Sequence, residues 1–119
     1  MRVLIIENSG VAQLLRTILK RDGHEPVLAG NGHEGWRLLV DPARPPDLLI
    51  LDRMLPDMDG AEVLARLRRH AHTAELPVLV LTAAARSSLH LDDGVLTRVL
   101  AKPFELVELR RVLVELASG

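Results

Sequence analysis

The amino-acid sequence predicts an α/β fold in which a five-stranded parallel sheet carries helices on both faces. Short apolar runs alternate with segments of helical periodicity along the chain, and such alternation is typical of a parallel sheet. The chain has 119 residues and is 48% hydrophobic, which is enough for one packed domain. Because crossover connections are right-handed, the strand order 2-1-3-4-5 is the natural arrangement at this length.

The strands are expected where apolar residues cluster without helical spacing. Residues 48–51 form an unbroken apolar run flanked by turn formers, as in a strand that is buried on both faces. Pro26 lies in the second run, and proline belongs on edge strands because it cannot donate a ladder hydrogen bond. The second strand is an edge in the order given above. The five expected strands are residues 3–6, 26–29, 48–51, 78–81 and 98–101.

The helices are expected where apolar residues recur every three or four positions. The first follows Asn8 and Ser9, either of which can cap it, and it ends before Gly23. The second is capped by Asn31 and weakened by two glycines. The connection 83–97 mixes helix-favouring and helix-breaking residues, so we expect a short or irregular fourth helix there. The other expected helices cover residues 31–40, 61–70 and 104–117.

Composition narrows the classes of function. The net charge is −1 and aromatic residues make up 2% of the chain, so neither attraction to DNA or anionic membranes nor stacking on bases is indicated. The absence of cysteine excludes a disulfide or a thiolate metal site and fits a reducing compartment. No signal peptide is recognisable, and no apolar run approaches the ~20 residues that cross a bilayer. We therefore expect a cytoplasmic domain.

Polar residues follow the inner strands at the points where those strands end. Glu7 and Asn8 follow the first strand, Asp52 the third, Thr82 the fourth and Lys102 the fifth. Because the carboxyl ends of parallel strands meet at one edge of the sheet, these side chains are expected to converge there. Oxygen ligands suit a hard cation such as Mg²⁺. A cation, a lysine and a hydroxyl around one carboxylate suit phosphoryl transfer.

Three motifs along the chain resemble a known family. They are PDLLILDRMLPDMDG at residues 46–60, LTA at 81–83 and KPF at 102–104. The first closely resembles the phosphoacceptor signature of the response-regulator receiver domain of two-component signalling, and the others resemble its two remaining signatures. Each motif is weak alone, but three in this order are a strong indication. The resemblance covers essentially the full chain, and it implies a single receiver domain, residues 1–119, with the flavodoxin-like fold.

The resemblance implies roles for the residues at the strand ends. Asp52 would accept a phosphoryl group from a histidine kinase or phosphotransfer protein, through a Mg²⁺-dependent attack by its carboxylate. Thr82 would hydrogen-bond to the phosphoryl group, and Lys102 would pair with it. The Lys102–Pro103 bond is expected to be cis, as is usual in the family. Such a domain is an acceptor rather than a turnover enzyme, and the added charge would switch a surface that an output partner or a second copy reads.

The metal ligands that the resemblance implies are Glu7, Asn8, Asp52 and the backbone carbonyl of Met54. The family normally has two acids after the first strand, whereas this chain has only one. At ~4 Å and an effective dielectric of ~20, the missing charge is worth about 4 kcal/mol, part of which desolvation offsets. We therefore expect Mg²⁺ to bind more weakly than in a receiver with both acids. Asn8 is expected to serve mainly as a helix cap.

Two further departures keep a second hypothesis open. Val99 stands where the family usually has an aromatic residue that swings inward on activation, and the connection 83–97 is short. These features, with Asn8, favour a pseudo-receiver, which would act as an interaction module without Mg²⁺-dependent phosphorylation. The intact Asp52, Thr82 and Lys102 favour a phosphorylatable receiver.

Other candidate sites have ordinary structural explanations. A phosphohydrolase with Asp52 as its nucleophile is disfavoured, because Met54 occupies the position where a general acid would be needed. Asp57 and Asp59 are expected to be turn and cap residues, since the remaining ligands of a calcium loop are missing. The basic residues of 66–70 are expected to form a solvated helix face.

Overall fold

In the computed structural model, which describes residues 1–118, five parallel strands form one sheet in the order β2-β1-β3-β4-β5. The predicted fold class and strand order are therefore confirmed, and β2, which contains Pro26, is an edge strand. Each strand contains its predicted apolar run and extends it by one residue. The strands are β1 Arg2–Ile6, β2 Glu25–Ala29, β3 Leu48–Asp52, β4 Val78–Thr82 and β5 Thr97–Ala101.

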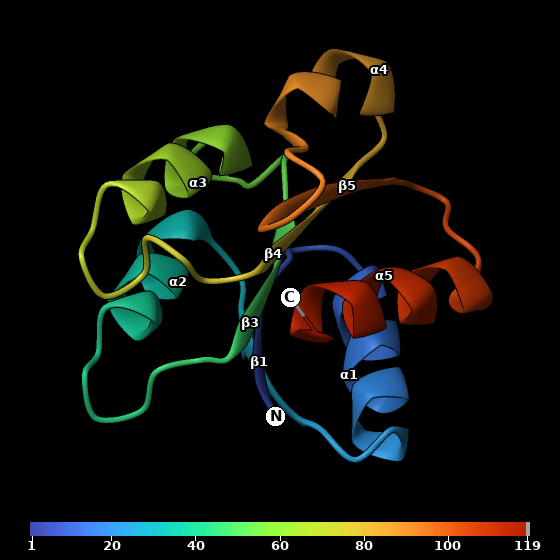
Figure 1. Cartoon of the computed structure of the whole chain (residues 1–119), viewed down its shortest axis with the longest axis horizontal. Coiled ribbons are helices and arrows are strands. Elements are labelled where there is room, and N and C mark those ends of the chain that lie inside the picture. The colour runs from blue at the N-terminus through green and yellow to red at the C-terminus, as the bar shows by residue number, and fades with distance from the viewer. Residues whose placement is uncertain (119) are drawn as a thin grey trace.

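Helices cover both faces of the sheet. Figure 1 shows α1 and α5 on one side and α2 and α3 on the other, with α4 near one end of β5. A 3-10 turn, Leu89–Leu91, follows α4 directly. The helices are α1 Val11–Arg21, α2 Gly32–Leu39, α3 Gly60–Arg68, α4 Ala85–Ser88 and α5 Leu106–Ser118.

The core is aliphatic and has two halves, one on each face of the sheet. Side chains alternate along a strand, so Val3 and Ile5 of β1 pack with α1 and α5, whereas Leu4 and Ile6 pack with α2 and α3. Every residue of β3 and β4 is buried. Since burying one such apolar side chain contributes about 1.5–3 kcal/mol, the two central strands are firmly fixed. The polar residues at their ends are held correspondingly well.

Helix α2 lies close to β1 because Gly35 has no side chain. A Cβ atom at this position would lie 2.3 Å from Cδ1 of Ile6. The glycine that lowers the helical propensity of this segment therefore permits its close packing. The Asn31 side chain accepts the N–H of Glu34 at 2.8 Å, which confirms it as the cap of α2.

The helix ends differ from prediction in several places. Asn8 was expected to cap α1, which is wrong: the N-cap residue is Gly10, and Asn8 lies too far upstream for its side chain to reach the first helical amides. The Ser9 hydroxyl instead accepts the N–H of Val11 at 3.3 Å. Helix α5 begins at Leu106, two residues later than expected, and α3 ends two residues earlier, which is the usual uncertainty at helix ends.

The connection between β4 and β5 has the irregular form that its sequence predicts. Helix α4 has only four residues, and the 3-10 turn after it has three. Within residues 1–118, no helix combines the length and the apolar character that crossing a membrane requires.

Candidate functional site

Three charged side chains meet where the inner strands end. Glu7 directly follows β1, Asp52 is the last residue of β3, and Lys102 directly follows β5. The Lys102 ammonium lies 3.0 Å from Oε2 of Glu7 and 3.2 Å from Oδ1 of Asp52. The Lys102–Pro103 peptide bond is cis, as expected. Residues 95 positions apart in the sequence thus form one charged cluster at the carboxyl edge of the sheet (102 − 7 = 95).

Thr82 ends the strand that lies between Asp52 and Lys102 in the sheet. Its carbonyl accepts the N–H of Lys102 at 2.9 Å, and its hydroxyl accepts the N–H of Ala84 at 2.9 Å. The residue is only 2% exposed, yet no acceptor for the hydroxyl proton is found among residues 1–118. Since a hydroxyl donates one hydrogen bond and accepts two, Thr82 keeps a donor available at this edge.

The two carboxylates are buried side by side. Glu7 is 3% exposed and Asp52 is 6% exposed. Burial and the adjacent Glu7 carboxylate raise the pKa of Asp52. Burial also acts to raise the pKa of Glu7, but hydrogen bonds, chiefly from the Ser9 hydroxyl at 2.6 Å, outweigh it and lower that pKa. With both carboxylates ionised, the cluster has one more negative than positive charge (−2 + 1 = −1), so it favours an additional cation.

The donor atoms at this edge fit a hard cation. Oε2 of Glu7 is buried and has no hydrogen-bond partner, although it lies beside the Lys102 ammonium. The Met54 N–H donates to Oδ1 of Asp52 at 3.2 Å, which brings the Met54 backbone to the same edge. Asn8 is exposed beside Glu7, and no hydrogen bond to its side chain is found in the described chain. Two carboxylates with carbonyl and amide oxygens suit Mg²⁺, which keeps several waters when it binds proteins.

This edge of the sheet has fewer acidic side chains than a metal site usually has. Residues 1–118 contain no group of three or more His, Cys, Asp or Glu side chains arranged to hold an ion. This agrees with the neutral Asn8 at the position after Glu7. The site therefore offers two carboxylates and depends on neutral oxygens and water for the rest of a coordination shell.

The loop after Asp52 turns sharply, and Gly60 makes the turn possible. A Cβ atom at Gly60 would lie 2.3 Å from the backbone oxygen of Asp52 and 2.8 Å from Cα of Arg53. The Asp59 side chain accepts the N–H of Ala61 at 2.9 Å and so caps α3, as predicted. The absence of a side chain at Gly60 therefore fixes how closely α3 approaches the end of β3.

Asp57 is an anchor for α2 rather than only a turn residue. Its carboxylate accepts the N–H of Gly32 at 2.8 Å and the N–H of His33 at 2.9 Å, and it also contacts the His33 ring. These amide hydrogen bonds, the Gly32 bond foremost, lower the pKa of Asp57 to about 2. The sequence could not show this role, because the partners of Asp57 lie 24 and 25 residues away.

Comparison with known proteins decides the family. The family model described as the response regulator receiver domain matches residues 3–114. The chain belongs to this family. It is 37% identical, over 111 residues and 91% of its length, to the DNA-binding dual master transcriptional regulator RpaA of Synechocystis. The alignment covers 45% of RpaA, so this receiver domain spans about half the length of that relative.

Solved structures share the fold of this receiver domain along its whole length. The non-phosphorylated HemR receiver domain from Leptospira biflexa superposes with a TM-score of 0.84 at 28% identity, covering 99% of this chain and 94% of that one. TrrA from Thermotoga maritima, in complex with Mg²⁺ and beryllofluoride, gives a TM-score of 0.80 at 26% identity, covering 97% of each chain. The site described above thus lies on a receiver fold.

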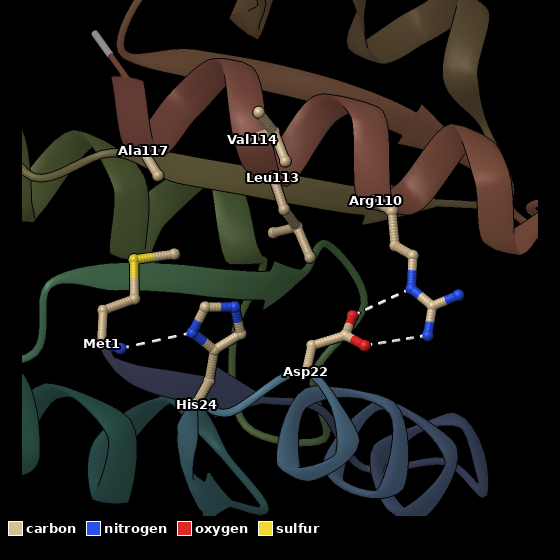
Figure 2. A pocket seen from close by; sticks show the side chains of 7 residues that line it. All are labelled: Met1, Asp22, His24, Arg110, Leu113, Val114 and Ala117. Carbon is tan, nitrogen blue, oxygen red and sulfur yellow. Dashed lines mark hydrogen bonds and ion pairs between the residues drawn. The ribbon is translucent and has the colours of Figure 1, made fainter.

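A separate cavity lies away from this site. It has a volume of about 380 Å³ and opens between the start of β1, the end of α1 and the last turns of α5 (Figure 2). Leu113, Val114 and Met1 form much of its wall. At its rim, Arg110 donates two hydrogen bonds to Asp22, each 2.9 Å long. Because Met1 precedes β1, the cavity is at the opposite edge of the sheet from Asp52 and contributes nothing to the charged cluster.

Proposed function

We propose that this receiver domain accepts a phosphoryl group on Asp52 from the phosphohistidine of a histidine kinase or a phosphotransfer protein. The observation that supports this most strongly is the ammonium of Lys102, which lies 3.2 Å from the Asp52 carboxylate on a converging strand end. An Asp52 oxygen forms a bond to phosphorus while the phosphorus–nitrogen bond to the donor imidazole breaks. The bonding electrons remain on that imidazole, which then takes up a proton.

The neighbouring side chains have complementary roles in this reaction. Lys102 pairs with the negative charge that the phosphoryl group adds beside Glu7 and Asp52. Thr82 donates its available hydroxyl proton to a phosphoryl oxygen. Phosphoryl transfer depends mostly on placement and charge neutralisation, and these fixed groups at the edge of a buried sheet provide both. The domain acts once per phosphoryl group, as an acceptor rather than a turnover enzyme.

Magnesium is the cofactor that we propose for this site. When bound, it neutralises charge on the phosphoryl oxygens and on the carboxylates. Glu7 and Asp52 would hold it with their carboxylates, Met54 with its backbone carbonyl, and Asn8 with its amide oxygen. The binding of Mg²⁺ and beryllofluoride by TrrA supports this assignment. Because Asn8 carries no charge, we propose that the affinity for Mg²⁺ is lower than in receivers with two acids at this edge.

The metal proposal is tested by titrating the protein with Mg²⁺. The variant Asn8→Asp adds the missing negative charge and should tighten binding by at least tenfold, which corresponds to about 1.4 kcal/mol. Gln13→Glu, which adds the same charge on the exposed side of α1, is the matched control and should change affinity little. Equal Mg²⁺ affinities for the parent and Asn8→Asp would refute the proposal.

The phosphoacceptor proposal is tested by intact-protein mass spectrometry. The parent protein and Asp52→Asn are incubated with a small-molecule phosphodonor and Mg²⁺. We expect a phosphoadduct on the parent and none on the variant. If the parent gains no adduct at any Mg²⁺ concentration, the domain is a pseudo-receiver that interacts with partners without phosphorylation.

The output of the domain is a further proposal. Residues 1–119 form one receiver unit whose surface changes when Asp52 gains charge, and an output partner or a second copy reads that surface. RpaA is DNA-binding by name, but the net charge of −1 in this chain does not suggest that the receiver unit itself contacts nucleic acid. Measuring oligomeric state with and without Mg²⁺ and beryllofluoride distinguishes a second copy from another partner.

A further inference from the structure

The residue after Asp52 contacts helix α4. The guanidinium of Arg53 donates to the Ser88 hydroxyl at 2.6 Å and to the Ser87 carbonyl at 3.2 Å. The same side chain lies 3.3 Å from the Asp59 carboxylate. Ser88 is fully buried and the Arg53 side chain is 21% exposed, so the Arg53–Ser88 hydrogen bond is partly shielded from water. It connects the β3–α3 loop directly to α4.

The Ser88 hydroxyl continues this connection toward Thr82. It donates to the carbonyl of Ala84 at 2.9 Å while it accepts from Arg53. The Ala84 N–H in turn donates to the Thr82 hydroxyl at 2.9 Å. A hydroxyl can donate one hydrogen bond and accept two. The Ser88 hydroxyl therefore has room for both of its bonds, and the Thr82 hydroxyl can accept from Ala84 while its own proton stays free to donate. The path runs from the neighbour of Asp52, through α4, to the hydroxyl at the end of β4.

The orientation of the Thr82 hydroxyl depends on this path. The Ala84 N–H occupies one lone pair of the hydroxyl oxygen, which leaves the proton to point elsewhere. Ala84 is exposed and precedes a helix of four residues that has no side-chain cap. A helix this short has little stability of its own. The carbonyl of Ala84 accepts from the Ser87 hydroxyl at 3.1 Å and from the Ser88 hydroxyl at 2.9 Å, and Arg53 contacts both of these serines, so it helps to hold Ala84 in place.

We propose that Arg53 is a positioning residue for phosphoryl binding, acting through Ser88 and Ala84 to hold the Thr82 hydroxyl ready to donate. This rests on the proposed function of Asp52 as the phosphoacceptor. The ion pair of Arg53 with Asp59 does not account for the arrangement, because the Asp59 side chain is 53% exposed and exposed pairs contribute little.

The test measures the affinity for beryllofluoride in saturating Mg²⁺ by calorimetry. Arg53→Met keeps an unbranched apolar stem at this position but loses the guanidinium donors, and Ser88→Ala removes the hydroxyl. Each should weaken beryllofluoride binding about five- to tenfold, the loss expected from one misplaced hydrogen bond. The matched control is Arg86→Met, which removes the same charge from an exposed position of α4 and should leave the affinity unchanged.

The double variant Arg53→Met/Ser88→Ala gives the decisive readout. If the two residues act along one path, the double variant binds about as weakly as either single variant, because their effects are not additive. Amide exchange at Ala84 should accelerate in all three variants and not in Arg86→Met. A merely structural role would lower the unfolding midpoint without changing the beryllofluoride affinity of the folded protein, and that result would overturn the proposal.

Two failures can be told apart in this experiment. Asp52→Asn is expected to bind no beryllofluoride. If the parent protein also binds none, the proposed function fails. If the parent binds it and the Arg53 and Ser88 variants bind it equally well, only the positioning role fails. Additive losses in the double variant would also overturn the path through Ser88, since two independent sites would then be responsible.

Discussion

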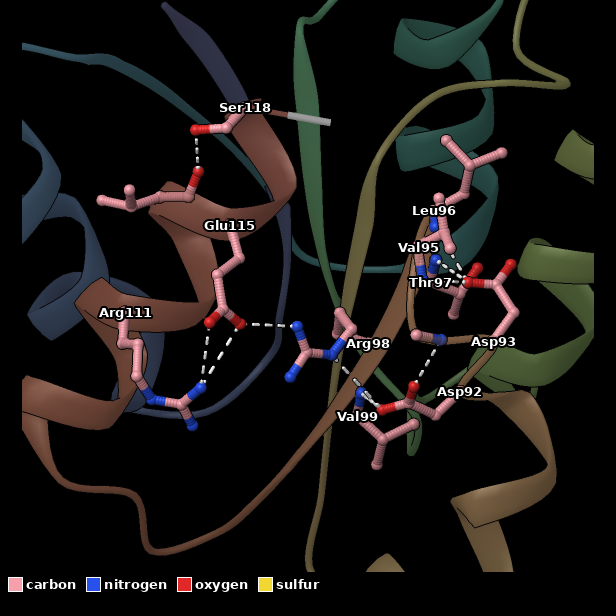
Figure 3. Close-up of polar contacts among 12 residues, drawn as sticks. Asp92, Asp93, Val95, Leu96, Thr97, Arg98, Val99, Arg111, Glu115 and Ser118 are labelled. Carbon is pink, nitrogen blue, oxygen red and sulfur yellow. Dashed lines mark hydrogen bonds and ion pairs between the residues drawn. The ribbon is translucent and has the colours of Figure 1, made fainter.

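The two ends of the connection between β4 and β5 are held in different ways. At the near end, which follows Thr82, helix α4 depends on the Arg53 side chain that reaches it from another loop. At the far end, Figure 3 shows the Asp93 carboxylate among the amides of its own loop. Asp93 accepts the N–H groups of Val95, Leu96 and Thr97 at 2.8–2.9 Å. Asp93 thus orders the far end from within its own loop, whereas Arg53, which contacts the near end, comes from the loop beside the site.

A second set of contacts fixes the far end to the rest of the domain. The Arg68 guanidinium donates to the carbonyls of Ala74, Leu76 and Leu96 and to the Thr97 hydroxyl, at 2.6–3.1 Å. This one side chain joins α3, the loop after it and the start of β5. The two ends therefore differ in what holds them: Arg53 from the loop after Asp52 contacts α4, whereas Arg68 and Asp93 hold the connection to β5.

Breaking the far end should have the largest effect on stability. Arg68→Met removes donors from several partly buried carbonyls, which would be left unsatisfied, so we expect the free energy of unfolding to fall by about 3 kcal/mol. Urea unfolding measures this loss. Arg69→Met is the matched control, because Arg69 is exposed and its side chain makes no hydrogen bond or ion pair within residues 1–118. Equal losses in both variants would contradict the anchoring role.

Distorting the β3–α3 loop, which carries Arg53, should have the next largest effect on stability. In Gly60→Ala the new methyl group meets the backbone of Asp52 and Arg53, and we expect a loss of about 2 kcal/mol from the strain. Gly10→Ala is the control, since a Cβ there meets nothing within 4 Å. Urea unfolding of both variants checks the prediction. A Gly60→Ala protein as stable as Gly10→Ala would show that the loop after β3 can move at little cost.

Lowering the pH should reduce the stability that Asp93 gives to the far end, and we expect this effect to be the smallest of the three. Burial acts to raise the pKa of Asp93, but the three amide hydrogen bonds outweigh it and lower that pKa below the ordinary 3.8. A lowered pKa in the folded state means stability that is present above pH ~3.8 and is lost as the pH falls through the lower value. In Asp93→Asn this titration is absent, so its urea midpoint should fall less steeply with acid than that of the parent. Parallel curves would contradict the role of the ionised carboxylate.

The sequence predicted the sheet well because its signals are local. Unbroken apolar runs mark β3 and β4. Once the strand order was predicted, it followed that the polar residues at their ends, Asp52 and Thr82, lie close together. The contact of Lys102 with Glu7 followed from the same reasoning. Asn8 was misjudged as a cap because the helix begins only after Gly10.

The contacts that the sequence did not reveal join segments far apart in the chain. The Arg53–Ser88 hydrogen bond spans 35 residues and depends on how far α4 stands from the β3–α3 loop. Gly60 could be recognised within a motif, but the reason for it, the approach of the Asp52 backbone, appears only in three dimensions. Local sequence patterns do not show which distant segments a long side chain can contact. A search for charged residues next to Asp52 is the signal that would have singled out Arg53.

The Asp22–Arg110 clamp at the rim of the cavity has a consequence for how the chain is assembled. It joins side chains 88 residues apart, and the apolar face of α1 shares its core with Leu109 and Leu113 of α5. During synthesis, α1 therefore emerges long before the helix that covers it. One half of the core stays open at the ribosome until α5 has been made.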